Sequence, residues 1–258
     1  MPSLILMYHD LANEGDSVPV GHRPYVLDVA VFRRHLEALA QHRRPVVTVA
    51  QWFSGAQAGE RIILTFDDGH VSNHTLALPL LHENGFKATF FVTAGSIGNG
   101  RTMNWGQIRA LHAAGMEIGS HTMTHRPPST LSDEELRYEL VTSRSVLENG
   151  LGAPVTSISS PTGFFNPRMK KIAREAGYQT LCFGQVGLVE DASDPFALPR
   201  IAVKRGMGQD AVEALLRFDR SAIRRMKYRQ VVPVLARRVL GSRFYLPVRR
   251  VLMGRLSL

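Results

Sequence analysis

Short apolar runs alternate with single helical stretches along most of this chain, and this alternation constrains the fold more than any other feature. Apolar runs at 4–8, 61–66 and 88–92 predict buried strands, and a helical stretch ending near 84–85 separates the last two. Strands separated by single helices pair in parallel. We therefore predict an α/β protein, and the number of repeats favours a distorted (β/α) barrel of about seven parallel strands over an open sheet.

Capping residues mark where several of the helices begin. Asp28 can cap a helix with apolar residues on one face, and Ser132 with Glu135 forms a capping box. Gly115 and Gly177 stop two further helices. The remaining expected elements are strands at 45–49, 116–119, 155–159, 180–183 and 198–203, and helices at 104–114, 132–147 and 167–176.

Polar residues follow two of the expected strands. Thr-Phe-Asp-Asp-Gly at 65–69 ends the strand 61–66, and Gly-Ser-His-Thr-Met-Thr-His at 119–125 ends the strand 116–119. In parallel α/β folds, functional groups gather at the carboxyl edge of the sheet. Either cluster alone is compatible with turn chemistry or solvated histidines, but both together after strands predict a functional site.

Three residues of these clusters predict a catalytic metal site. We expect His121 and His125, four residues apart, to lie on one face of a helical turn and bind one metal. Asp68 completes a set of two imidazoles and one carboxylate, which leaves positions open for water and substrate. Asp67 can remain uncoordinated and accept a proton from water. His70 is expected to be structural.

The pair of motifs T-F-D-D-G and H-T-x-x-H resembles the polysaccharide deacetylase family, carbohydrate esterase family 4, also called the nodulation-protein-B homology domain. The resemblance covers about residues 4–203. It implies a distorted (β/α) barrel that hydrolyses N-acetyl groups of an acetylated carbohydrate with a divalent metal, usually zinc. It also implies Asp67 as general base and Asp68, His121 and His125 as metal ligands.

The third family motif departs from its usual form. The family pattern Arg-x-Pro-Tyr-Gly corresponds here to Ser-Ser-Pro-Thr-Gly at 159–163, so the arginine that orients the base is missing. The resemblance implies that the backbone N–H of Thr162 can still bind the oxyanion, since a main-chain donor does not depend on the side chain. Arg200 or Lys204 is expected to supply the lost positive charge.

The late family motif, Leu-x-Leu-His-Asp, is absent from the C-terminal half, but Leu-Met-Tyr-His-Asp at 6–10 matches it at the front of the chain. This arrangement resembles the circularly permuted branch of the family and implies His9 as general acid. The alternative is a strand-end histidine hydrogen-bonded to Asp10.

Charge and apolar patterning divide the chain into two parts. Of the 31 basic and 22 acidic residues, 12 basic and one acidic residue lie from Arg217 onward, so the upstream part is nearly neutral. We predict a deacetylase-like catalytic domain over 1–216 and a basic amphipathic helical tail over 217–258. The apolar face expected from Arg243 onward can lie on an anionic membrane surface or pack on the barrel.

Location and partners follow from what the sequence lacks. The first ten residues carry no basic leader, and no apolar run approaches the roughly 20 residues of a spanning helix, so we expect a cytoplasmic protein, peripheral on the inner face of the membrane if the tail binds lipid. No nucleic-acid-reading module is recognisable, and no nucleic-acid partner is expected. Cys182, the only cysteine, is expected to be buried in a strand.

The alternative function is a catalytically impaired, deacetylase-like protein that binds glycans or anionic polymers.

Overall fold

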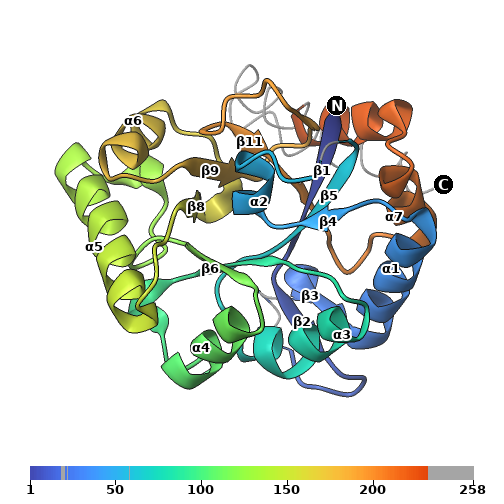
Figure 1. Ribbon diagram of the computed structural model, residues 1–258, viewed down its shortest axis with the longest axis horizontal. Coiled ribbons are helices and arrows are strands. Elements are labelled where there is room, and N and C mark those ends of the chain that lie inside the picture. Colours follow the sequence, from blue (N-terminus) through green and yellow to red (C-terminus); the bar gives the residue numbers. More distant parts are fainter. Residues whose placement is uncertain (19–20, 22, 58, 232–258) are drawn as a thin grey trace, which may run out of the picture.

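A nearly closed, barrel-like parallel sheet forms the centre of the computed structural model, which describes residues 1–18, 21, 23–57 and 59–231 (Figure 1). The strand order is β10-β1-β5-β6-β7-β8-β9-β11, with β12 paired to β1 and β4 paired to β5. Every pair is parallel except β1 with β10. The strands are β1 (Pro2–Tyr8), β4 (Val46–Val47), β5 (Arg61–Phe66), β6 (Thr89–Val92), β7 (Glu117–Ser120), β8 (Ser157–Ser159), β9 (Thr180–Phe183), β10 (Val189–Glu190), β11 (Leu198–Pro199) and β12 (Ile201–Ala202).

Two short strands on either side of Arg200 close the ring. Strand β11 pairs with β9 through Leu198 and Cys182, and β12 pairs with β1 through Ile201 and Leu6. The predicted strand 198–203 is therefore divided between two neighbours, and Arg200 lies at the seam. A separate pair, β2 (Asp10–Ala12) and β3 (Val26–Asp28), was not predicted.

Helices cover the outer face of the ring, while one short helix packs against its inner face. The helices are α1 (Val29–His42), α2 (Val49–Phe53), the π-helix η2 (Asn73–Ala77), α3 (Leu78–Glu83), α4 (Trp105–Ala113), α5 (Asp133–Leu151), α6 (Pro167–Glu175) and α7 (Gln209–Leu216). Figure 1 shows the longer helices around the sheet and α2 near the centre of the view. Short 3-10 turns η3 (Ala94–Ser96) and η5 (Pro161–Gly163) follow β6 and β8.

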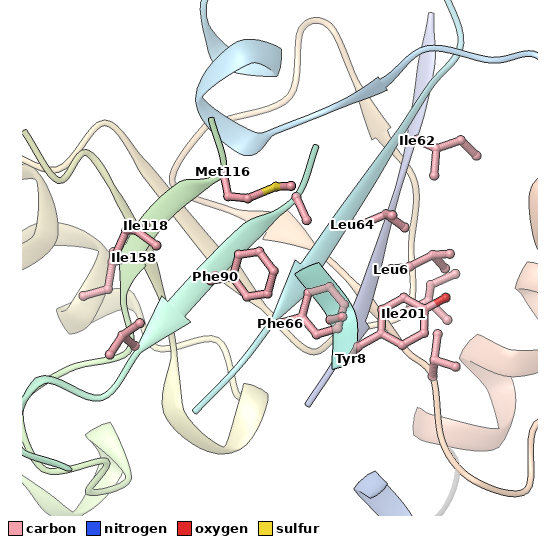
Figure 2. Packing of buried hydrophobic residues seen from close by; sticks show 14 of the residues in the cluster. Leu6, Tyr8, Ile62, Leu64, Phe66, Phe90, Met116, Ile118, Ile158 and Ile201 are labelled. Atoms are coloured by element: carbon pink, nitrogen blue, oxygen red, sulfur yellow. The ribbon is translucent and has the colours of Figure 1, made fainter. Parts of the chain in front are cut away.

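Alternation along the strands gives the sheet two different apolar clusters. In β5, Leu64 and Phe66 belong to the large cluster shared with the surrounding helices, whereas Ile63 belongs to a smaller cluster with Trp52 of α2. Figure 2 shows part of the large cluster, in which Phe66 stacks on Phe90 with ring centroids 4.8 Å apart. The face that carries Ile63 consists of every second residue of β5 and continues to the residue after the strand, Asp67.

Most predicted elements are confirmed, and the capping residues act as expected. Asp28 accepts from the N–H of Ala30, and the Ser132–Glu135 capping box is formed. The predicted strand 45–49 is wrong in its second half, because Thr48 caps α2 instead of continuing the strand. Cys182 is buried in β9, and burial raises the pKa of its thiol to about 12.

Residues beyond α7 also contribute to the core, since Phe218 and Ile223 are buried in the large cluster. The apolar face expected from Arg243 onward, and with it the membrane surface, lies outside the described residues. Within the described residues, no helix is both long and apolar enough to cross a membrane.

Candidate active site

Asp67 is the first residue after β5 and lies on the same strand face as Ile63 and Thr65. Its N–H donates to the carbonyl of Tyr8, which ties the end of β5 to the end of β1. The side chain is almost fully buried, and both carboxylate oxygens accept from Arg200, at 2.7 Å each. Asp67 is thus held in one orientation by a bidentate pair.

Arg200 is completely buried and is fixed by further contacts. Its guanidinium donates to the hydroxyls of Thr65 at 3.1 Å and Ser159 at 2.6 Å, and it lies over the Phe91 ring. Burial alone raises the pKa of Asp67, but the charges of Arg200 and His121 outweigh burial and hold that pKa below its ordinary value. Of the two residues considered for the lost positive charge, Arg200 supplies it, whereas Lys204 lies over the ring of Tyr25.

Asp68, His121 and His125 converge as predicted. Oδ1 of Asp68 lies 3.4 Å from Nε2 of His121 and 3.4 Å from Nε2 of His125, and one ligand atom from each residue lies within 4.8 Å of the others. Two ligands about 2.1 Å from one ion at a tetrahedral angle are about 3.4 Å apart. The donor set and its spacing therefore fit a divalent metal with open positions.

The two histidines are not on a helical turn, and that prediction is wrong. Residues 121–125 form an irregular turn after β7, in which Thr122 (φ 65°) and His125 (φ 59°) are left-handed. Asp68 is also left-handed, with φ 73°. Such conformations are costly for non-glycine residues and persist where surrounding contacts enforce them.

Glu139 of α5 supplies part of that enforcement. This buried carboxylate accepts from the N–H groups of Met123 and Thr124, both at 2.8 Å, and from the Thr124 hydroxyl. On the other side of the turn, the N–H of Gly95 donates to the carbonyl of Met123 at 2.8 Å. Sequence reasoning missed Glu139, because a core-facing acid on a long helix carries no local sign of its partner.

Neighbouring residues outside the group of Asp68, His121 and His125 orient the atoms that would bind the metal. Nδ1 of His121 lies 3.1 Å from the carbonyl oxygen of Ser159, so Nδ1 carries the proton and Nε2 is free to bind a metal. The second carboxylate oxygen of Asp68, Oδ2, lies 3.4 Å from Nε2 of His70. Burial raises the pKa of Asp68, but hydrogen bonding to His121 and His70 holds it well below its ordinary value.

His70 was expected to be structural, yet it connects Asp68 to a charged cluster at the end of β1. Nδ1 of His70 lies 3.9 Å from Oδ2 of Asp10, and the same oxygen accepts from Arg101 at 2.7 Å. The other oxygen of Asp10 accepts from Ser72 at 2.6 Å. The signal available in the sequence was the position of His70, two residues after a candidate ligand.

His9 follows β1 and faces the same centre. Its pKa is lowered mainly by burial, while the charges of Asp67 and Asp68 act in the opposite direction. Asp10 hydrogen-bonds to Ser72 and Arg101, so the alternative of a His9–Asp10 hydrogen bond is not observed. Among the described residues, Nδ1 of His9 is buried without a hydrogen-bond partner.

Thr162 lies in η5, the turn after β8, whose last residue, Ser159, contacts both Arg200 and His121. The backbone of Thr162 is left-handed, with φ 62°. Trp105 of α4 packs against Gly150 of α5, where an added Cβ would meet its ring at 2.1 Å.

Comparisons with known proteins find polysaccharide deacetylases. The family model described as polysaccharide deacetylase matches residues 54–181. YxkH of Bacillus subtilis, whose name places it among polysaccharide deacetylases, is 28% identical over 82% of this chain and 75% of its own length. A peptidoglycan-N-acetylglucosamine deacetylase of Bacillus cereus is 36% identical over 47% of this chain, which spans only 56% of that protein.

Solved structures of deacetylases have a similar fold. The Streptococcus pyogenes deacetylase PplD, solved in complex with acetate, superimposes with a TM-score of 0.75 at 22% identity, over 84% of this chain and 97% of PplD. Sequence motifs, fold and the matched family model agree, and the chain belongs to the polysaccharide deacetylase family.

Proposed function

We propose that this protein is a metal-dependent carbohydrate N-deacetylase, with residues 1–216 as its catalytic unit. The observation that carries the proposal is the convergence of Asp68, His121 and His125 beside a second carboxylate, Asp67, that is held by Arg200 rather than by the metal ligands. The peptidoglycan-N-acetylglucosamine deacetylase relative supports an N-acetylated amino sugar as the substrate class.

Two imidazole nitrogens and one carboxylate oxygen favour zinc as the metal. A divalent metal bound by Asp68, His121 and His125 supplies Lewis acidity, which polarises the acetamide carbonyl and lowers the pKa of water at the site.

The side chains then divide the proton transfers between them. Asp67, kept ionised by Arg200, accepts the proton of the attacking water as the oxygen bonds to the acetamide carbon. The backbone N–H of Thr162 donates to the oxyanion that develops. His9 donates a proton to the nitrogen as the carbon–nitrogen bond breaks, and acetate and an amino sugar leave. The lowered pKa of His9 makes its protonated form a stronger acid.

The catalytically impaired alternative rested on the missing arginine of the third motif. Arg200, between β11 and β12, places a guanidinium against the proposed base, so that support is lost. A second function is therefore not favoured.

Acetate release from N-acetylglucosamine oligomers, measured with metal content on the same samples, tests the proposal. Asp67→Asn should abolish turnover and retain the metal, and Asp68→Asn should lose both. His82→Gln, which changes an exposed histidine at the end of α3, is the matched control and should behave as wild type. Wild-type turnover by Asp67→Asn would refute the assigned role of the base.

A further inference from the structure

Asn73, at the start of η2, is a fully buried asparagine that the proposed mechanism does not use. Its N–H donates to the carbonyl of His70 at 3.0 Å, and its carbonyl accepts from the N–H of Leu78, five residues along, as in a π-helix. Both bonds fix the backbone of Asn73 and leave its side-chain amide for other partners. π-helical turns are rare and occur frequently at functional sites, and a buried amide is costly without a hydrogen bond. The partner of this amide therefore indicates what Asn73 does.

The amide of Asn73 contacts the residue proposed as the proton donor. Its Nδ2 donates to the backbone carbonyl of His9 at 2.8 Å. Because a carbonyl oxygen can accept but not donate, the nitrogen of the amide must face it, and the orientation of the side chain is fixed. His9 lies between β1 and β2 and belongs to neither strand, so sheet pairing does not hold it as it holds Tyr8. Asn73 thus anchors His9 at the point where β1 ends.

The residue before Asn73 strengthens the same attachment. The hydroxyl of Ser72 accepts from the N–H of Leu11 at 3.0 Å and donates to the carboxylate of Asp10 at 2.6 Å. Ser72 and Asn73 together therefore hold three consecutive residues, 9–11, against the start of η2.

This attachment matters for His9 because few other contacts orient its ring. A carboxylate against Nδ1 commonly orients a histidine that transfers protons. In the part of the chain that the structure describes, Nδ1 of His9 is buried without a hydrogen-bond partner, and the ring lies against Tyr25 with centroids 4.7 Å apart. The placement of the imidazole therefore depends on where the backbone of His9 is held.

We infer that Asn73 is a positioning residue for His9 in the proposed reaction. The inference rests on the proposed deacetylase function, and it predicts a selective defect. An amine leaves a breaking amide only as it takes up a proton, whereas p-nitrophenolate leaves an ester as a stable anion without one. Loss of the Asn73 amide should therefore slow amide hydrolysis and spare ester hydrolysis, because the base and the candidate metal ligands stay in place.

The test compares two substrates on the full-length, zinc-loaded protein. Acetate release is measured from N-acetylglucosamine oligomers, and p-nitrophenyl acetate is followed by the part of p-nitrophenolate release that a chelator removes. We expect Asn73→Ala to lower kcat for the amide about 10- to 100-fold with a nearly unchanged KM, as for a misplaced catalytic group, and to leave the ester rate within about threefold of the wild type. His9→Gln should show the same selectivity, with a loss of about 100-fold or more.

A second variant and a matched control separate this role from general damage to the fold. Asn73→Asp keeps the shape of the side chain without its N–H donor and should give the same selective loss. Asn84→Ala is the control, because Nδ2 of Asn84 donates to the carbonyl of Leu80 at the same 2.8 Å, at the end of α3, and it should keep the wild-type ratio of amide to ester turnover. Equal losses on the two substrates, or a wild-type ratio in both Asn73 variants, would overturn the inference.

A further measurement does not depend on turnover. If the wild type releases no acetate from the amide, the proposed function fails, and the ring signals of His9 in ¹⁵N–¹H NMR spectra decide about Asn73. These signals are assigned by their loss in His9→Gln. A change in Asn73→Ala but not in Asn84→Ala supports the positioning role, whereas unchanged signals in Asn73→Ala, or the same change in both variants, overturn it.

Discussion

Replacing Arg200 by Met tests whether the buried pair with Asp67 organises the site. The substitution removes two charge-assisted hydrogen bonds of 2.7 Å to a carboxylate that is almost fully buried. Each such bond contributes about 1.5–3 kcal/mol, and breaking a buried pair by removing one partner costs about 3–5 kcal/mol. We expect the free energy of unfolding to fall by about 3–5 kcal/mol, and kcat to fall at least about a hundredfold because the base loses its orientation and its counter-charge.

The assay is urea unfolding followed by circular dichroism in the presence of a chelator, so that metal binding does not contribute to stability. Arg33→Met is the matched control, since Arg33 forms an ion pair with Glu83 at 3.0 Å with both side chains more than half exposed. Exposed pairs of this kind contribute about 0–1 kcal/mol.

A double-mutant cycle with Asp67→Asn isolates the pair itself. Once Asp67 is neutral, Arg200 is a buried charge without its counter-ion, and removing it should cost far less than in the wild type. Additive effects of the two substitutions, or an Arg200→Met cost no larger than that of Arg33→Met, would refute this reasoning.

Three further outcomes are expected. His70→Leu should weaken zinc binding about 10- to 100-fold in a competition titration while the protein stays folded, because Oδ2 of Asp68 loses its neighbour; unchanged affinity would assign His70 a packing role only. Gly119→Ala should destabilise the protein by about 1–3 kcal/mol in urea unfolding, because the new Cβ would meet the Phe91 ring at 2.6 Å, and a neutral effect would contradict the close packing inside the ring. Burial, with a smaller effect of a nearby arginine, lowers the pKa of His35 to about 4, so the unfolded chain binds its proton more readily and stability should fall between about pH 6.5 and pH 4, by up to about 3 kcal/mol. His35→Leu should flatten that part of the pH–stability curve, and an unchanged slope would exclude His35 as its source.

The residues of the candidate metal site could be predicted from sequence because they follow strands whose ends meet at one edge of a sheet. Asp68 and His121 each lie within two residues of a strand end. The local geometry of the His121–His125 turn could not be predicted in this way, because its left-handed residues depend on Glu139 from a distant helix.

The choice between Arg200 and Lys204 was also beyond local reasoning. Arg200 lies within the expected strand 198–203 and Lys204 follows it, and only the division of that segment between β9 and β1 turns Arg200 toward Asp67. The contact between Asp10 and Arg101 joins residues 91 positions apart, and neither residue shows a pattern that identifies the other.

The candidate active site combines residues from different parts of the chain, and one of them is placed by the seam of the barrel. The segment 54–181 that matches the family model contains Asp67 and all three residues of the candidate metal site, but neither His9 nor Arg200. His9 lies beside the others because β1 pairs with β5, whereas Arg200 is placed only where β11 pairs with β9 and β12 pairs with β1. Closure of the ring is therefore what gives the proposed base its arginine. The orientation of that carboxylate is in this sense a property of the completed circle, not of any one segment of the chain.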